Sequence, residues 1–181
     1  MRIQALDSVL LVVDLQTRLL PAICEGEVVL ANATWLVDVA KNLNISVLAT
    51  EQYPQGLGFT EANLRARLSD DSTIIEKIHF SAVTEGKLLK HANAHHQQWV
   101  VVGTEAHVCV QQTVLDLLAQ RLQVFVVEDA VGSRKPRDKI LALERMRQNG
   151  AEIVSREMVA FEWLGQANTP EFREVLKQFL R

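Results

Sequence analysis

Short runs of apolar residues recur along the chain, separated by longer stretches in which apolar residues have helical spacing. The runs cover residues 8–14, 45–50, 72–77, 99–103, 122–129 and 151–155. They are rich in Val and Ile and apolar almost throughout, which is typical of strands buried on both faces of a parallel sheet. The pattern therefore predicts six mostly parallel strands.

The stretches between the runs are long enough for crossover helices. Helical spacing is present at 29–43, 110–120, 137–150 and 169–181. The predicted buried faces are Trp35, Val39 and Leu43; Val110, Val114, Leu117 and Leu118; Ile140, Leu143 and Met146; and Phe172, Val175, Leu176, Phe179 and Leu180. Asn149-Gly150 and Thr169-Pro170 supply helix caps. Alternating strands and helices predict a three-layer α/β/α fold of Rossmann-like type.

Length and composition narrow the class of protein. A chain of 181 residues that is 48% hydrophobic suits one domain spanning 1–181. The net charge is −3 and there is no basic block, which argues against a nucleic-acid partner. Two cysteines, Cys24 and Cys109, indicate no disulfide framework and fit a reducing, cytoplasmic setting. We expect no membrane partner, because no stretch approaches the roughly 18 apolar residues of a span.

Chemically capable side chains follow three of the predicted strands. Asp14 ends the first run, Lys77 ends the third, and the fourth leads through Gly103 to Cys109 at the start of a helical pattern. In open parallel sheets, ligands bind beyond the carboxyl ends of the strands. We therefore expect these residues to gather at one edge of the sheet.

A cysteine, a lysine and an aspartate at one edge can form a nucleophilic site. A thiol attacks as its thiolate, and we expect Lys77 and a helix N-terminus to lower the pKa of Cys109. Asp14 could accept the thiol proton and later deliver it to a leaving amine. Each residue also has a structural alternative: Asp14 as a cap, Lys77 as a solvated surface residue and Cys109 as part of the core. Spacing alone leaves this choice open.

The motifs at these positions resemble those of the isochorismatase-like cysteine hydrolases. That family opens with an apolar strand ending in D-x-Q, here "LLVVDLQ" with Asp14 and Gln16. It has a lysine after the third strand, here in "IIEKIHFSA", and a G-x5-C-V-x2-T signature, here "GTEAHVCVQQT". A later strand ends near D-A, here in "VFVVEDAVGSR". The stretches "TEQYPQGLG" and "ALERMRQNGAEIVSREM" resemble the narrower group of isochorismatase-domain-containing proteins.

The resemblance implies the isochorismatase-like hydrolase fold and a catalytic triad of Asp14, Lys77 and Cys109. It also implies a cis peptide bond between Thr104 and Glu105, with the N–H groups of Glu105 and Cys109 forming an oxyanion hole. Homo-oligomers, dimeric or larger, are implied as well. The amphipathic C-terminal helix could serve such a contact or could equally close the core of the monomer.

Four further residues are candidates for binding a small-molecule substrate: Gln16, Glu51, Tyr53 and Phe80. Gln16 belongs to the D-x-Q motif, and Glu51 and Tyr53 follow the second run, where a pocket wall is expected. The alternative for Glu51 is a capping acid of the loop that follows it. Phe80 could equally belong to the core.

Departures from the family pattern restrict the chemistry. Metal-bearing nicotinamidases carry D-x-H and a further His after the second strand, whereas "ATEQYPQGLGFT" contains no His. The histidines at 79, 91, 95, 96 and 107 show no zinc-site spacing, so we expect neither a metal nor another cofactor. His107 lies close enough to Cys109 in sequence for a Cys–His dyad, although Asp14 and Lys77 already supply those roles. True isochorismatases lack the nucleophilic cysteine, so Cys109 argues against cleavage of a vinyl ether.

The sequence predicts a cysteine hydrolase that cleaves a small amide or related C–N bond through a thioester intermediate. The alternative is a catalytically silent interaction protein that retains the fold. A phospho-receiver domain is disfavoured, because Asp14 stands alone where receivers carry an acidic pair. A dinucleotide-binding enzyme is disfavoured, because "LQTRLLPA" after the first strand has no glycine fingerprint.

Overall fold

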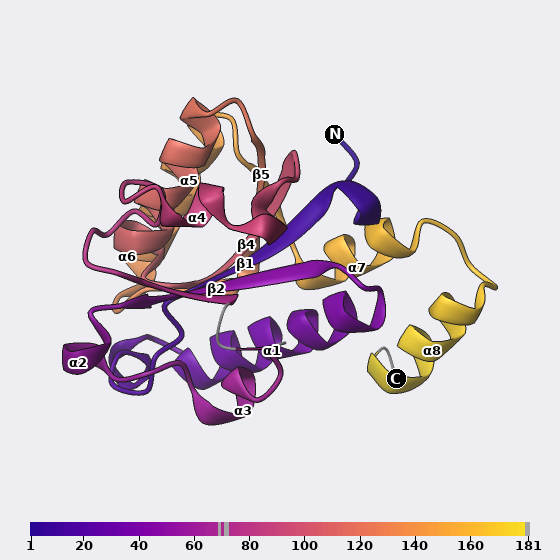
Figure 1. Cartoon of the computed structure of the whole chain (residues 1–181), viewed down its shortest axis with the longest axis horizontal. Coiled ribbons are helices and arrows are strands. Elements are labelled where there is room, and N and C mark those ends of the chain that lie inside the picture. Colours follow the sequence, from indigo (N-terminus) through magenta and orange to yellow (C-terminus); the bar gives the residue numbers. More distant parts are fainter. Residues whose placement is uncertain (69, 71–72, 180–181) are drawn as a thin grey trace.

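A parallel six-stranded sheet forms the centre of the computed structural model, which describes residues 1–68, 70 and 73–179 (Figure 1). The strand order is β3-β2-β1-β4-β5-β6, and every pairing is parallel. The strands are β1 (Ser8–Val13), β2 (Ser46–Gln52), β3 (Ile74–Lys77), β4 (Gln98–Thr104), β5 (Gln123–Gly132) and β6 (Glu152–Val154). This arrangement confirms the predicted fold class.

Helices cover both faces of the sheet. The longer ones are α1 (Gly26–Asn42), α5 (Gln111–Ala119), α6 (Pro136–Gln148), α7 (Arg156–Leu164) and α8 (Pro170–Phe179). Short helices fill the connections on either side of β3: α2 (Pro54–Leu57), α3 (Ala62–Arg65) and α4 (Lys87–Lys90). A π-helical turn, η5 (Ala106–Val110), joins β4 to α5. No helix in the described part of the chain is long and apolar enough to cross a membrane.

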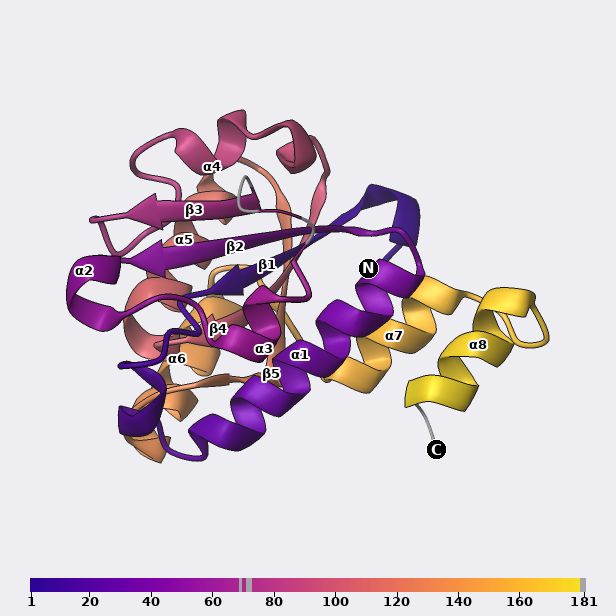
Figure 2. The same ribbon diagram turned by 60° about the horizontal axis from the view of Figure 1, so that its bottom comes forward.

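Alternate residues of each central strand enter two separate cores. Leu10 and Val12 of β1 pack in the core shared with α1, α7 and α8, whereas Val9, Leu11 and Val13 pack in the core shared with α5 and α6. Figures 1 and 2 show these two sets of helices on opposite faces of the sheet. Burial on both faces explains why the strand runs are apolar almost throughout.

The predicted elements match the observed ones with small shifts of their ends. Each apolar run contains a strand, although residue 72 of the third run lies outside the described residues. The four predicted helices correspond to α1, α5, α6 and α8, with residues 180–181 of the last also outside that range. The pattern gives no prediction for α7. Ile140 and Leu176 are corrections: they are 54% and 36% exposed, and Ala142 is buried on α6 instead of Ile140.

The C-terminal helix closes the core of the monomer. Val175 of α8 is fully buried, and the indole Nε1 of Trp35 in α1 donates to the backbone oxygen of Phe179 at 2.9 Å. The Trp35 and Phe179 rings meet edge to face, with their centroids 6.5 Å apart. These contacts bury Val175 and part of Phe179 within the monomer, whereas Leu176 of the same stripe is 36% exposed.

Gly103 lets β1 and β4 approach closely at the carboxyl edge of the sheet. Its φ of +121° lies where side chains are rarely tolerated, and it pairs with Val13 of β1. A Cβ at this position would lie 2.0 Å from the Val13 carbonyl oxygen. Asp14 and Thr104 come directly after the paired residues Val13 and Gly103, so this approach sets the spacing of the candidate site.

Candidate active site

Asp14 is fully buried at the end of β1 and adopts a positive φ of 50°. Its Oδ1 accepts a hydrogen bond from the Thr50 hydroxyl at 2.7 Å. Its backbone oxygen accepts another from the Thr104 hydroxyl at 2.7 Å. Neighbouring strands β2 and β4 therefore fix both the carboxylate and the main chain of Asp14.

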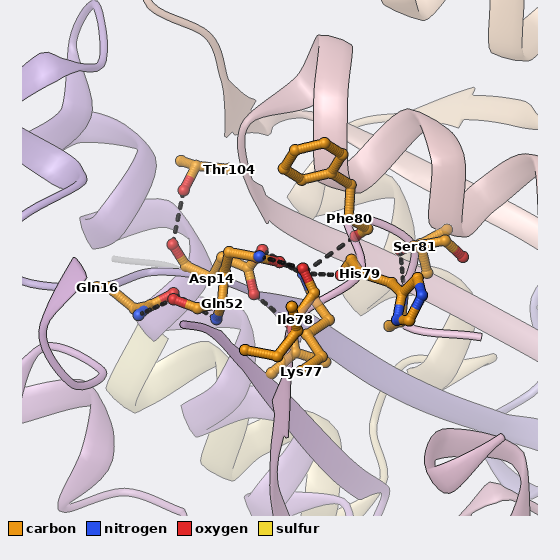
Figure 3. Close-up of polar contacts among 12 residues, drawn as sticks. Asp14, Gln16, Gln52, Lys77, Ile78, His79, Phe80, Ser81 and Thr104 are labelled. Carbon is orange, nitrogen blue, oxygen red and sulfur yellow. Dashed lines mark hydrogen bonds and ion pairs between the residues drawn. The ribbon is translucent and has the colours of Figure 1, made fainter. Parts of the chain in front are cut away.

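Lys77 ends β3 and is 2% exposed. Its Nζ donates to Asp14 Oδ2 at 2.8 Å, to Gln52 Oε1 at 2.7 Å and to the Phe80 backbone oxygen at 3.0 Å, as Figure 3 shows. A buried ammonium is costly unless it is paired and hydrogen-bonded, and here it is both. The pair places one positive and one negative charge at the edge of the sheet.

Cys109 completes the group from the other side of β1. It lies in η5, is 4% exposed, and follows a cis peptide bond between Thr104 and Glu105. Its thiol interacts with both the Asp14 carboxylate and the Lys77 ammonium. The three residues that the sequence placed at the strand ends therefore meet in one buried group.

The pKa of the Cys109 thiol is raised well above its ordinary value. Burial is the main cause, the Asp14 carboxylate adds to it, and Lys77 opposes both. The expectation of a lowered pKa is therefore wrong in its net direction, because desolvation outweighs the lysine. In the resting protein the thiol keeps its proton, and Asp14 is the adjacent base that can receive it.

The side chains on the far side of Cys109 form a separate polar cluster. The Glu105 carboxylate accepts from Arg134 Nε at 3.0 Å and lies 3.6 Å from His107 Nε2. The other ring nitrogen of His107 contacts the Ser133 hydroxyl at 3.0 Å. Both ring nitrogens thus have partners other than the thiol, which disfavours a Cys–His dyad.

Gln16 and Glu51 are buried and hydrogen-bonded to the end of β2 and to the segment that follows it. Gln16 Nε2 donates to the backbone oxygens of Gln52 and Gly58 at 3.0 and 2.6 Å, and its Oε1 accepts from the Gln52 N–H at 2.8 Å. Glu51 Oε1 accepts from both the N–H and the hydroxyl of Thr60 at 2.7 Å. We infer that both side chains hold this loop against the sheet.

Tyr53 and Phe80 lie at the rim, each 52% exposed. The Tyr53 N–H donates to the Lys77 backbone oxygen at 2.9 Å, so its exposed ring lies near the end of β3. Phe80 contributes its backbone oxygen to Lys77 and leaves its ring free. Both rings are half-exposed, and the Tyr53 ring packs over Gly56 of α2.

Sequence reasoning missed Thr50 and Gln52, which hold the charged pair from β2. Thr50 ends the second apolar run and Gln52 lies two residues beyond it, and both are polar and buried. Polar residues at the end of a buried strand were the available signal of a polar site, since a buried polar side chain needs a partner. Within the described residues, no group of three His, Cys, Asp or Glu side chains is placed to hold a metal ion.

Comparison with protein families gives a match over most of the chain. The model described as the isochorismatase domain matches residues 8–158. Isochorismatase domain-containing protein 2 of Danio rerio is 37% identical over 178 residues, covering 97% of this chain and 88% of the fish protein.

Two solved structures have a similar fold. The structure called MAR1 ribonuclease from Caenorhabditis elegans has a TM-score of 0.91 and 38% identity, covering 100% of this chain and 93% of that one. The YcaC gene product of Escherichia coli, described as an octameric hydrolase of unknown specificity, has a TM-score of 0.91. At 24% identity, with 99% of this chain and 91% of that one covered, the second likeness concerns the fold alone.

Proposed function

Because the chain belongs to the isochorismatase family, we propose that it is a hydrolase in which Cys109 is the nucleophile and the substrate is a small amide. The observation that carries this proposal is the buried group of Asp14, Lys77 and Cys109. A nucleophile beside a base, with that base held by a third group, is the arrangement that covalent catalysis requires. Here Lys77 and Thr50 hold the base.

Acylation begins with the protonated thiol. As the Cys109 sulfur attacks the amide carbon, its proton passes to the Asp14 carboxylate. The N–H groups of Glu105 and Cys109 would stabilise the negative charge on the carbonyl oxygen. Asp14 then donates the proton to the nitrogen as the C–N bond breaks, which leaves a thioester and a free amine or ammonia.

Deacylation reverses these roles with water as the nucleophile. Asp14 accepts a proton from water as the water oxygen attacks the thioester carbon. The C–S bond breaks, the sulfur recovers its proton from Asp14, and a carboxylic acid leaves. The N–H groups of Lys77 all have acceptors, so its role is electrostatic: it stabilises Asp14 and the sulfur when either is anionic.

The substrate we propose is small and uncharged or mildly polar. Asp14 and Lys77 cancel each other's charge, so the group does not favour a substrate of either sign. The exposed Tyr53 and Phe80 rings offer an apolar rim. The proposed steps need no metal or other cofactor.

We propose that the chain forms homo-oligomers. Ile78, between Lys77 and the rim residue Phe80, is 65% exposed, and Tyr53 adds a second exposed apolar side chain nearby. Apolar side chains grouped at one edge often mark a contact with another protein. A second copy of the chain is the occupant that the resemblance implies.

Cleavage of RNA is a second candidate, because one relative with 38% identity is called a ribonuclease. RNA binding normally depends on basic surface that neutralises phosphates. This chain has a net charge of −3, and its Lys77 ammonium is buried and saturated. The amide proposal therefore has the stronger support.

A substrate panel separates these possibilities. We expect at least one small primary amide to release ammonia with wild-type protein, while an RNA oligomer remains intact. RNA cleavage without amide hydrolysis would favour the ribonuclease candidate. A blank result on both would favour the catalytically silent interaction protein.

A further inference from the structure

The acceptors around Lys77 are not equivalent. One is the carboxylate of Asp14, two are the backbone oxygens of Phe80 and, at 3.4 Å, of His79, and one is the side-chain amide of Gln52. The Gln52 contact is as short as the ion pair, at 2.7 Å. Gln52 thus occupies one ammonium proton without adding a charge.

The orientation of the Gln52 amide is fixed by its surroundings. Its Nε2 donates to the Ile78 backbone oxygen at 2.6 Å, so Oε1 is the atom that faces Lys77. Its backbone N–H and C=O are both bound by the Gln16 side chain. With 8% of its surface exposed, Gln52 has little freedom to move.

We propose that Gln52 is a positioning residue for the hydrolase chemistry, which holds Lys77 on Asp14 and limits how strongly the ammonium stabilises the Cys109 sulfur. The catalytic meaning of this role rests on the proposed function. The amide is suited to it because it is neutral. A carboxylate in the same place would compete with Asp14 for the ammonium and add a second negative charge beside the thiol.

The other charged groups near Lys77 have partners of their own, and the ring of His79 contacts Glu85 Oε1 at 3.2 Å. Glu85, on the loop after β3, accepts from the N–H groups of Ile78 and His79 and pairs with Lys87. Lys87 and these hydrogen bonds hold the pKa of Glu85 well below its usual range, so it stays ionised. Glu51 on β2 is bound by Thr60 and Arg65.

Alkylation of Cys109 reports on this arrangement without any substrate. In a Cys24→Ala background, we would measure the iodoacetamide rate at Cys109 from about pH 6 to 10 by peptide mass spectrometry. Gln52→Glu is expected to slow alkylation about tenfold or more, because the added charge disfavours the thiolate. Gln52→Met is expected to speed it several-fold, because Lys77, relieved of the Gln52 contact, stabilises the thiolate more strongly.

Opposite changes in the alkylation rate distinguish a positioning role from general loosening of the fold, because partial unfolding would speed alkylation of Cys109 in both variants. The matched controls are Gln98→Glu and Gln98→Met, which change a buried glutamine at the opposite end of the sheet, bound to Gln4, Arg2 and Gln123. We expect these controls to leave the Cys109 rate unchanged.

The proposal is overturned if the Gln52 variants alter the rate no more than their controls, or if both speed it alike. Should Gln52→Glu fail to fold, the comparison of Gln52→Met with Gln98→Met decides alone, and an unchanged rate contradicts the proposal. Failure of the proposed function is a separate result. It would appear as turnover by a Cys109→Ala variant, whatever the alkylation rates of the Gln52 variants show.

Discussion

Replacing Cys109 with alanine is expected to abolish amide hydrolysis, lowering kcat by at least about 10⁴-fold. The sulfur forms and breaks the covalent bond, and no neighbouring side chain can take over that role. Asp14 remains as a base, but its carboxylate is held by Thr50 and Lys77. The measurement is ammonia release from the amide identified in the substrate panel.

The fold of this variant should survive. Cys109 packs against apolar neighbours of η5 and α5, and losing its sulfur leaves only a small cavity, which costs about 1 kcal/mol. Thermal unfolding followed by circular dichroism checks this. The exposed Cys24 provides the matched control, since Cys24→Ala should keep full activity. Substantial turnover by folded Cys109→Ala protein would refute the nucleophile assignment.

Substituting alanine for Gly103 is expected to prevent folding, with a loss of more than about 4 kcal/mol of unfolding free energy. The new Cβ would lie 2.0 Å from the Val13 oxygen and 2.7 Å from the Val13 N and C atoms. These are backbone atoms in the middle of the sheet, so no side-chain rotation can relieve the clash. The residue would also be strained at φ +121°.

Gly165→Ala is the matched control, because it shares the positive φ but not the contact. Its φ is +69°, and an added Cβ would meet nothing within 4 Å. We expect a cost of about 1–2 kcal/mol there, from backbone strain alone. Urea denaturation compares the two. Gly103→Ala protein as stable as Gly165→Ala protein would show that the strands need not approach so closely.

The sheet, and the gathering of reactive side chains at its carboxyl edge, could be predicted from sequence because both depend on short-range signals. Uninterrupted apolar runs such as 99–103 indicate strands buried on both faces. Residues placed just after such runs must meet at one edge, since the carboxyl ends of parallel strands lie together. By this rule the sequence predicts that Asp14, Lys77 and Cys109 lie close together although they are far apart in the chain.

Side-chain environment could not be predicted in the same way. Periodicity gives no measure of desolvation, and burial reverses the expected direction of the Cys109 pKa shift. The roles of Gln16 and Glu51 depend on where the loop after β2 returns to the sheet. Ile140 fits a helical stripe, yet α6 turns it outward because the buried stripe passes through Ala142 instead.

Trapping the covalent intermediate tests the central claim most directly. Wild-type protein would be mixed with its amide substrate, quenched in acid within one turnover and digested for peptide mass spectrometry, with a parallel sample containing hydroxylamine. We predict the acyl mass on Cys109 and, with hydroxylamine, the corresponding hydroxamate. Ammonia release at the full rate with neither acyl-Cys109 nor hydroxamate would contradict a thioester mechanism.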